Sequence, residues 1–192
     1  MKITKKELHY TRIQTKIGWI SVLHCGKTIQ KLVLPESKET LPELFSQEIV
    51  LILGPDRVFQ KSLEKWFHRY FWGDGKAFDR AEIDLSAFTP FQQKTLQECQ
   101  KIPFGTTVSY KELAIRVGSP NASRAIGNAM ASNPIPLIIP CHRVIQTSGH
   151  LGGYSAPGGL SLKKELLDHE FSKNKRKNKE VSTLQKPLAG IR

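Results

Sequence analysis

Several classes of protein are excluded by what the 192-residue chain lacks. Its three cysteines, Cys25, Cys99 and Cys141, are an odd number without a CxxC pair, which argues against a disulfide scaffold and a cysteine-rich zinc site. No apolar run approaches the about 18 residues of a membrane-spanning helix, and no apolar segment follows the charged start MKITKKELHY. We therefore expect a protein that is neither secreted nor inserted in a membrane. The expected location is the cytoplasm, or the nucleus if the source is eukaryotic.

A metal site near the N-terminus is also not expected. His9, His24 and Cys25 carry ligand atoms, but adjacent residues of a strand point to opposite faces. The sequence accordingly predicts no bound metal and no other cofactor.

Acidic residues are absent between Glu112 and Glu165, in a chain of net charge +12. The last 22 residues carry seven Lys or Arg and one Glu, which is half of the excess. A surface without carboxylates suits a polyanion, because Lys and Arg displace the counterions of phosphates. A merely solvated basic surface is the alternative. The cations inside the acid-free window are Arg116, Arg124, Arg143, Lys163 and Lys164.

The first half of the chain has the pattern of a small α/β unit. Residues 7–34 alternate as strands do, and residues 57–72 have helical apolar spacing closed by Gly73. Residues 73–87 are typical of a linker. Nothing in this unit indicates chemistry.

The second half predicts helices separated by short turns. A helix is expected after Pro90, and Ser109 and Glu112 form a capping box for the helix SYKELAIRV. After Gly118-Ser119-Pro120, Asn121 is a suitable N-cap for ASRAIGNAMAS. Helix, turn and helix outline a helix-turn-helix, although many helical hairpins touch no DNA. The small residues of the second helix suit close packing, against another helix or a DNA groove.

The stretch LIIPCHRV, residues 137–144, holds Cys141 in a stiff segment that also contains nearby prolines. A lone cysteine is most often a packed core residue. Here His142 and Arg143 are neighbours of the kind that lower a thiol pKa. In an extended chain His142 would face away from Cys141, so a bridging water is the simpler link between them.

These motifs resemble the O6-alkylguanine-DNA alkyltransferases. The similarity rests on PCHRV, the preceding NPIPLIIP, the following GGYS and the upstream VSYKELAIRVGSPNASRAIGNAMASNP, and is dense over about residues 88–170. It implies an α/β ribonuclease H-like N-terminal domain with linker (1–87) and a mainly α helix-turn-helix domain (88–170). Beyond a helix ending near Glu170, we expect a disordered basic tail (171–192). Three roles are open for it: non-specific DNA affinity, which we favour, a nuclear address if the source is eukaryotic, or no role.

The resemblance also implies roles for matching residues. Cys141 would accept the alkyl group, with His142 (through a water) and Glu170 relaying its proton and Asn133 tying the turn before it. Arg124 would replace the extruded nucleotide in the base stack, and Tyr110 would crowd the phosphate and protonate the leaving guanine. The implied base pocket is Met130, Pro136, Tyr154 and Ser155, and the implied DNA-backbone contacts are Lys111, Ser119 and Thr147. Gly153 departs from the family, which often has Asn there.

The expected reaction follows from the chemistry of a thiolate. A soft sulfur nucleophile suits displacement at the saturated carbon of O6-alkylguanine, and a thioether offers water no carbonyl to attack. We expect one turnover per molecule, by a monomer acting on double-stranded DNA that contains O6-alkylguanine, and O4-alkylthymine by the resemblance. Two alternatives are a non-enzymatic protein that binds the same lesion and a thiol hydrolase with a direct Cys–His bond.

Overall fold

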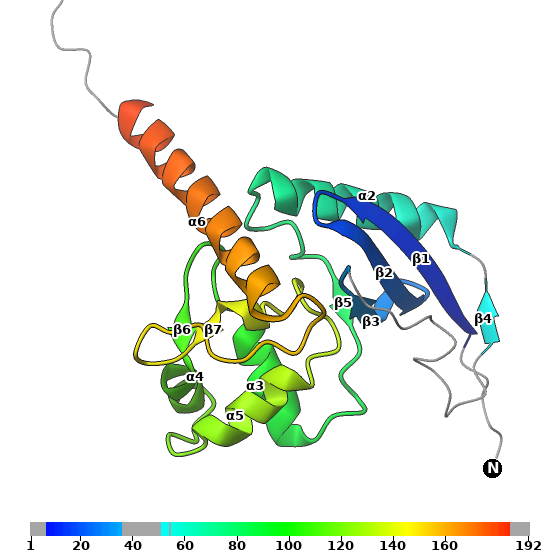
Figure 1. The fold of residues 1–192 in the computed structure, drawn as a ribbon. Helices are drawn as coiled ribbons and strands as arrows, with labels where there is room; N and C mark the ends of the chain where they lie inside the picture. Colours follow the sequence, from blue (N-terminus) through cyan, green and yellow to red (C-terminus); the bar gives the residue numbers. More distant parts are fainter. Residues whose placement is uncertain (1–6, 36–50, 54, 185–192) are drawn as a thin grey trace, which may run out of the picture.

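The computed structural model describes residues 7–35, 51–53 and 55–184. Its N-terminal unit is a mixed sheet in the order β4-β1-β2-β3-β5, with α2 lying along β1 (Figure 1). β1, β2 and β3 pair antiparallel, whereas β4 is parallel to β1 and β5 is parallel to β3. The elements are β1 (Glu7–Thr15), β2 (Gly18–Cys25), β3 (Thr28–Val33), β4 (Leu51–Leu53), α2 (Arg57–Trp72) and β5 (Glu82–Ile83).

The three predicted strands and the predicted helix of this unit are confirmed. Asp56 caps α2 by accepting hydrogen bonds from two backbone amides, and Gly73 ends it with a φ of 103°. Part of the expected linker, however, is strand β5. It forms because the edge of β3 offers free backbone groups, and Ile29 O accepts a bond from Asp84 N at 3.0 Å.

The C-terminal unit is mainly helical, with one two-stranded sheet that joins β6 to β7 in parallel. Ser109 and Glu112 form the expected capping box at the start of α4. The second helix begins one residue later than expected: Ala122 instead of Asn121 is its N-cap and makes no side-chain cap bond, because Ser119–Ala122 form a turn. The elements are α3 (Pro90–Gln100), β6 (Val108–Ser109), α4 (Tyr110–Arg116), α5 (Ser123–Ala131), η1 (Cys141–Arg143), β7 (Val144–Ile145) and α6 (Gly159–Leu184).

Helix α6 corrects the expected end of the ordered chain. It continues through residues 171–184, which were predicted to be disordered, and projects from the body in Figure 1. No glycine or proline interrupts the sequence between Gly159 and Pro187, and the lysines there favour a helix. Residues 185–192 of the expected tail lie outside the described residues.

The two units share one hydrophobic core. Buried residues from the sheet, from α2 and from the C-terminal helices belong to a single cluster, and Leu32 N donates to Pro134 O at 2.8 Å between the units. Within the described ranges, no helix is long and apolar enough to cross a membrane.

Replacing Ser109 by Ala should destabilise the protein by about 1 kcal/mol, because the first turn of α4 loses its cap. The Ser109 hydroxyl accepts a bond from Glu112 N at 3.0 Å, and the Glu112 carboxylate accepts one from Ser109 N. Urea unfolding measures the change. Ser86→Ala, at an exposed serine, is the control, and equal midpoints for the two variants would contradict the capping role.

Candidate active site

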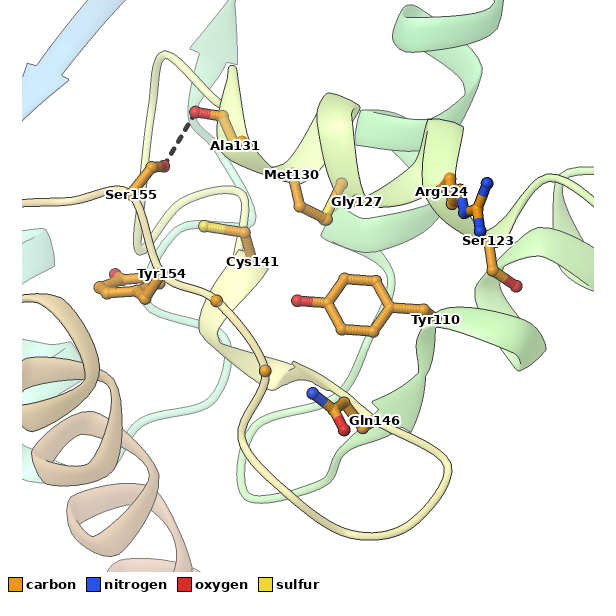
Figure 2. Close-up of a pocket in the computed structure, with 12 residues that line it drawn as sticks. Tyr110, Ser123, Arg124, Gly127, Met130, Ala131, Cys141, Gln146, Tyr154 and Ser155 are labelled. Carbon is orange, nitrogen blue, oxygen red and sulfur yellow. Dashed lines mark hydrogen bonds between the residues drawn. The ribbon is translucent and has the colours of Figure 1, made fainter.

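Cys141 lies at the start of a tight helical turn rather than in an extended segment. Residues 141–143 form the 3-10 helix η1, directly after Pro140. The expectation of an extended chain here is therefore wrong, because successive side chains of a 3-10 helix are rotated by about 120° rather than the 180° of a strand. Cys141 is 6% exposed and borders a cavity of about 580 Å³ (Figure 2).

Asn133 holds the segment that carries the thiol. Its side-chain amide donates to Ile139 O at 2.8 Å and to Cys141 Sγ at 3.1 Å, and its Oδ1 accepts from Ile135 N at 3.0 Å. Within this loop, buried Leu137 has a φ of 71°, a conformation that a residue with a β-carbon rarely adopts. The expected tie between the α5 turn and the cysteine is thus present.

The pKa of the Cys141 thiol is raised by burial, against the hydrogen bond from Asn133 and the positive charge of Lys163. Both opposing effects stabilise a thiolate. The thiol is consequently protonated at neutral pH.

His142 is buried and bonded to Glu170. Its Nε2 lies 2.8 Å from Glu170 Oε1. An ionised carboxylate only accepts, so Nε2 carries the hydrogen and Nδ1 keeps its lone pair. Among the described residues, none bonds to this buried Nδ1. Burial lowers the pKa of His142, although its bond to Glu170 opposes this.

Glu170 is the centre of a buried network. Arg143 donates to its two oxygens, each at 2.9 Å, Gly105 N donates at 3.0 Å and the Tyr70 hydroxyl at 2.7 Å. Burial would raise the pKa of Glu170, but the bonds and charges of His142 and Arg143 hold it far below its usual range. The carboxylate is therefore ionised throughout the physiological range.

Two cations that the sequence places in the acid-free window are not on the surface. Arg143 is buried against Glu170 and donates to Ile102 O at 2.6 Å. Lys163 is fully buried and donates to Val144 O at 2.7 Å and Gly153 O at 3.3 Å. Neither side chain is available to a polyanion: Arg143 balances the charge of Glu170, and Lys163 donates hydrogen bonds to two backbone carbonyls.

Lys163 is a site residue that the sequence reasoning missed. Burial lowers its pKa to about 8, while the Cys141 and Cys99 thiols oppose the shift. Lys163 lies between the buried Leu162 and Leu166 in the sequence of α6. It also lies seven residues before Glu170, which puts both side chains on one face of the helix. That spacing was the signal, because it puts a lysine on a core-facing stripe.

The cavity has most of the expected walls. Of the predicted residues, Tyr110, Arg124, Met130, Tyr154 and Ser155 line it together with Cys141. Pro136 does not line it: this proline is buried and bridges to Ile139, so its predicted place in the base pocket is wrong. Lining residues that the sequence reasoning missed are Ser123, Gly127, Ala131, Gln146 and Gly152. Gly153, noted only as a departure from the family, is a further lining residue.

One face of α5 forms a whole wall. Ser123, Gly127 and Ala131 recur at intervals of four and therefore lie on the same side of the helix. This periodicity could have identified them in the sequence. Figure 2 shows Arg124 at one end of this wall, and Ser155 bonded to Ala131 near the other, where Cys141 also lies.

The glycine-rich loop closes the opposite side. Gly152 has a φ of 69°, and a β-carbon there would lie 3.0 Å from the ring of Tyr110, so glycine lets the loop approach this ring. Ser155 Oγ donates to Ala131 O at 2.8 Å and links the loop to α5. The buried Tyr154 hydroxyl has no partner among the described residues.

The residues expected to contact the DNA backbone lie outside the cavity. Lys111 and Thr147 are exposed, and Ser119 is half-buried in the turn between α4 and α5. None of the three lines the cavity. No group of three or more His, Cys, Asp or Glu within the described part of the chain could hold a metal ion.

The chain is similar to known proteins over most of its length. The family described as 6-O-methylguanine DNA methyltransferase, DNA binding domain, matches residues 90–172. A methylated-DNA–protein-cysteine methyltransferase of Mycobacterium tuberculosis is 35% identical over 166 residues, 86% of this chain and 94% of that one. The chain belongs to this family.

Further members agree with the assignment. A probable methyltransferase of the same name from Acanthamoeba polyphaga mimivirus is 43% identical over 159 residues, 82% of this chain and 93% of that one. The crystal structure of Mycobacterium tuberculosis OGT in complex with DNA has a TM-score of 0.70 at 32% identity, covering 87% and 94% of the two chains. The function is DNA repair by transfer of an alkyl group to a cysteine; a binding protein without transfer activity is not favoured.

Replacing Glu170 by Gln should destabilise the protein by about 3–5 kcal/mol at pH 7, because Arg143 is left buried without a counter-charge. The folded pKa of Glu170 is lowered, so its contribution is complete above the unfolded pKa of about 4.3 and is lost as pH falls below it. The difference in the free energy of unfolding between wild type and Glu170→Gln should therefore become smaller at acidic pH. Urea unfolding between pH 7 and pH 3 measures it.

The exposed Glu165 on the same helix provides the control. Glu165→Gln should change the free energy of unfolding by less than about 0.5 kcal/mol. A Glu170→Gln difference that stays constant with pH would contradict the assignment of an ionised buried carboxylate.

Proposed function

We propose that Cys141 accepts the alkyl group of O6-alkylguanine in double-stranded DNA, and of O4-alkylthymine, once per protein molecule. The observation that carries this proposal is the thiol at the cavity wall, bonded to Asn133, beside a histidine whose unpartnered Nδ1 can take a proton. The relatives are named for methylated DNA and a protein cysteine, which supports the substrate.

The proton of Cys141 passes to His142 Nδ1, through a water molecule. Glu170 orients the imidazole and stabilises the imidazolium that forms. With its pKa far below the usual range, Glu170 does not itself take the proton. The proposed relay therefore ends at His142, one step earlier than the sequence suggested.

The thiolate then attacks the alkyl carbon. A sulfur–carbon bond forms as the carbon–O6 bond breaks, and its electron pair goes to the guanine. Burial raises the pKa of Tyr110, so its hydroxyl is protonated and can donate to the leaving base. The thioether product is stable to water, and the protein is consumed.

The target carbon is enclosed in the duplex, so the nucleotide must be rotated into the cavity at a cost of a few kcal/mol. We assign α4 and α5 as a helix-turn-helix, with Arg124 entering the base stack and Tyr110 crowding the phosphate. Lys111, Ser119 and Thr147 contact the backbone, and Met130, Tyr154 and Ser155 surround the base. The protein acts as a monomer without a cofactor.

The N-terminal unit is assigned a ribonuclease H-like fold. Three antiparallel strands, with β4 added in parallel next to β1 and α2 along β1, support this assignment. The unit contributes no residue to the cavity lining.

Replacing Cys141 by Ala should abolish transfer and preserve DNA binding. Duplex DNA with a radiolabelled O6-methylguanine should place at most one equivalent of label on wild-type Cys141 and none on the variant. Cys25→Ala, at a half-buried thiol of β2, is the matched control and should transfer normally. Transfer by Cys141→Ala, or repeated turnover releasing methanol, would favour another acceptor or a hydrolase.

Replacing Arg124 by Ala should slow repair of duplex DNA about ten- to a hundredfold, because nothing replaces the extruded base. Arg124 is exposed at the cavity, whereas Arg116, exposed on α4 but outside the cavity, is the control. Single-turnover rates on duplex and on single-stranded DNA measure the effect. In single-stranded DNA no extruded base has to be replaced in a duplex stack. An equal loss of rate on single-stranded DNA would therefore exclude this role of Arg124.

A further inference from the structure

Tyr70 connects the N-terminal unit to the carboxylate beneath the active site. It lies in α2, is 1% exposed, and its hydroxyl donates to Glu170 Oε1 at 2.7 Å. The same oxygen accepts the hydrogen of His142 Nε2 at 2.8 Å. Arg143 Nη2 donates to this oxygen as well, at 2.9 Å. Three donors, one from the N-terminal unit and two from the C-terminal unit, thus share one oxygen.

The position of Tyr70 is fixed by its surroundings. Its ring contacts Phe71, Phe78, Phe104 and His169, with ring centroids between 5.0 and 5.9 Å apart. A side chain enclosed on several sides cannot withdraw its hydroxyl without disturbing the core.

A second contact from the N-terminal unit reaches His169, the residue before Glu170. Lys16 Nζ lies 2.8 Å from His169 Nδ1, and an ammonium can only donate, so Nδ1 accepts and Nε2 carries the hydrogen. Nε2 lies 3.5 Å from Tyr70 O. The N-terminal unit therefore holds two consecutive residues of α6 at the base of the site.

We infer that Tyr70 is a positioning residue of alkyl transfer, which sets how much of the negative charge of Glu170 is available to His142. This inference rests on the proposed roles of Cys141 and His142. It gives the N-terminal unit a part in activating the thiol, although that unit contributes nothing to the cavity wall.

The physical argument is competition for one carboxylate. Five hydrogen bonds reach Glu170, from Tyr70, Gly105, His142 and twice from Arg143, whereas a carboxylate offers about four lone-pair sites. Removing the Tyr70 hydroxyl leaves more charge facing His142. The imidazole then becomes a better proton acceptor, and Cys141 ionises at lower pH.

The other groups around the thiol stay unchanged in this comparison. Lys163 and Asn133 favour the thiolate of Cys141, while Tyr110, Tyr154 and Cys99 interact with it as neutral groups whose own pKa values are raised. Around His142, Arg143 and Lys163 oppose protonation and Glu170 favours it. A shift caused by Tyr70 must therefore pass through Glu170.

The test is the pH dependence of Cys141 reactivity in the full chain. Wild type and Tyr70→Phe are treated with iodoacetamide between pH 5 and pH 10, and modification of Cys141 is followed by mass spectrometry of its peptide. The midpoint for Tyr70→Phe should lie lower, so that modification below the midpoint is about two- to tenfold faster. Fluorotyrosine at position 70, a stronger donor, should move the midpoint in the opposite direction.

Tyr10→Phe is the matched control, because it also removes one tyrosine hydroxyl and one hydrogen bond from the N-terminal unit. Tyr10 bonds to Ser21 at 3.1 Å and not to Glu170. Its midpoint should equal that of wild type.

An unchanged midpoint for both Tyr70 proteins would overturn the inference and leave Tyr70 as a packing residue, even if Tyr70→Phe unfolds more easily. If Tyr70→Phe does not fold, the fluorotyrosine protein alone decides. Failure of the proposed function would look different: label from methylated DNA would appear elsewhere than Cys141, whatever the midpoints.

Discussion

The carboxylate of Glu170 is buried on α6 and accepts hydrogen bonds from η1, from the loop after α3 and from α2. Removing such a charge from water costs several kcal/mol, which only well-placed donors and counter-charges can offset. Those donors come from segments 27, 65 and 100 residues away along the chain. These hydrogen bonds consequently fix the positions of the segments relative to one another. Cys141 begins the turn η1, which carries the donors His142 and Arg143.

The same network supports the proposed reactivity of an enclosed cysteine. Burial alone keeps Cys141 protonated, which protects it from solvent reagents. In the proposed reaction the proton passes to His142, where the bond to Glu170 fixes one tautomer and leaves Nδ1 without a partner among the described residues. A negative group that stays ionised, rather than a second base, is what an imidazolium requires.

The cavity is shaped by small residues as much as by functional ones. Gly127 and Ala131 let α5 form a low wall, and Gly152 admits the Tyr110 ring on the other side. Lys163 joins the loop to β7 from below through two backbone carbonyls. The space in the cavity therefore results from small side chains, and the buried Lys163 holds two of the neighbouring segments together.

Much of the protein follows from local sequence. Alternation and helical spacing identify β1–β3 and α2, and the Ser109–Glu112 pair identifies the start of α4, because these signals act within one turn or one strand. The motif PCHRV with its flanks identifies the family, and with it the cysteine that we propose as the acceptor. Local patterns failed at β5, which forms against β3, a partner distant in the sequence. At α6 the local signal was present, since no glycine or proline stops the helix beyond Glu170, and the prediction of disorder there was wrong.

The site shows the same division. The sequence by itself determined that a thiol, a histidine, an arginine and a glutamate belong together, since they sit in recognisable motifs. Only the tertiary structure decided what each does. It buried Arg143 instead of exposing it, left Pro136 out of the cavity lining and brought Tyr70 to Glu170. The reason is physical: burial and hydrogen-bond partners arise from segments that meet in space, and no local spacing encodes that meeting.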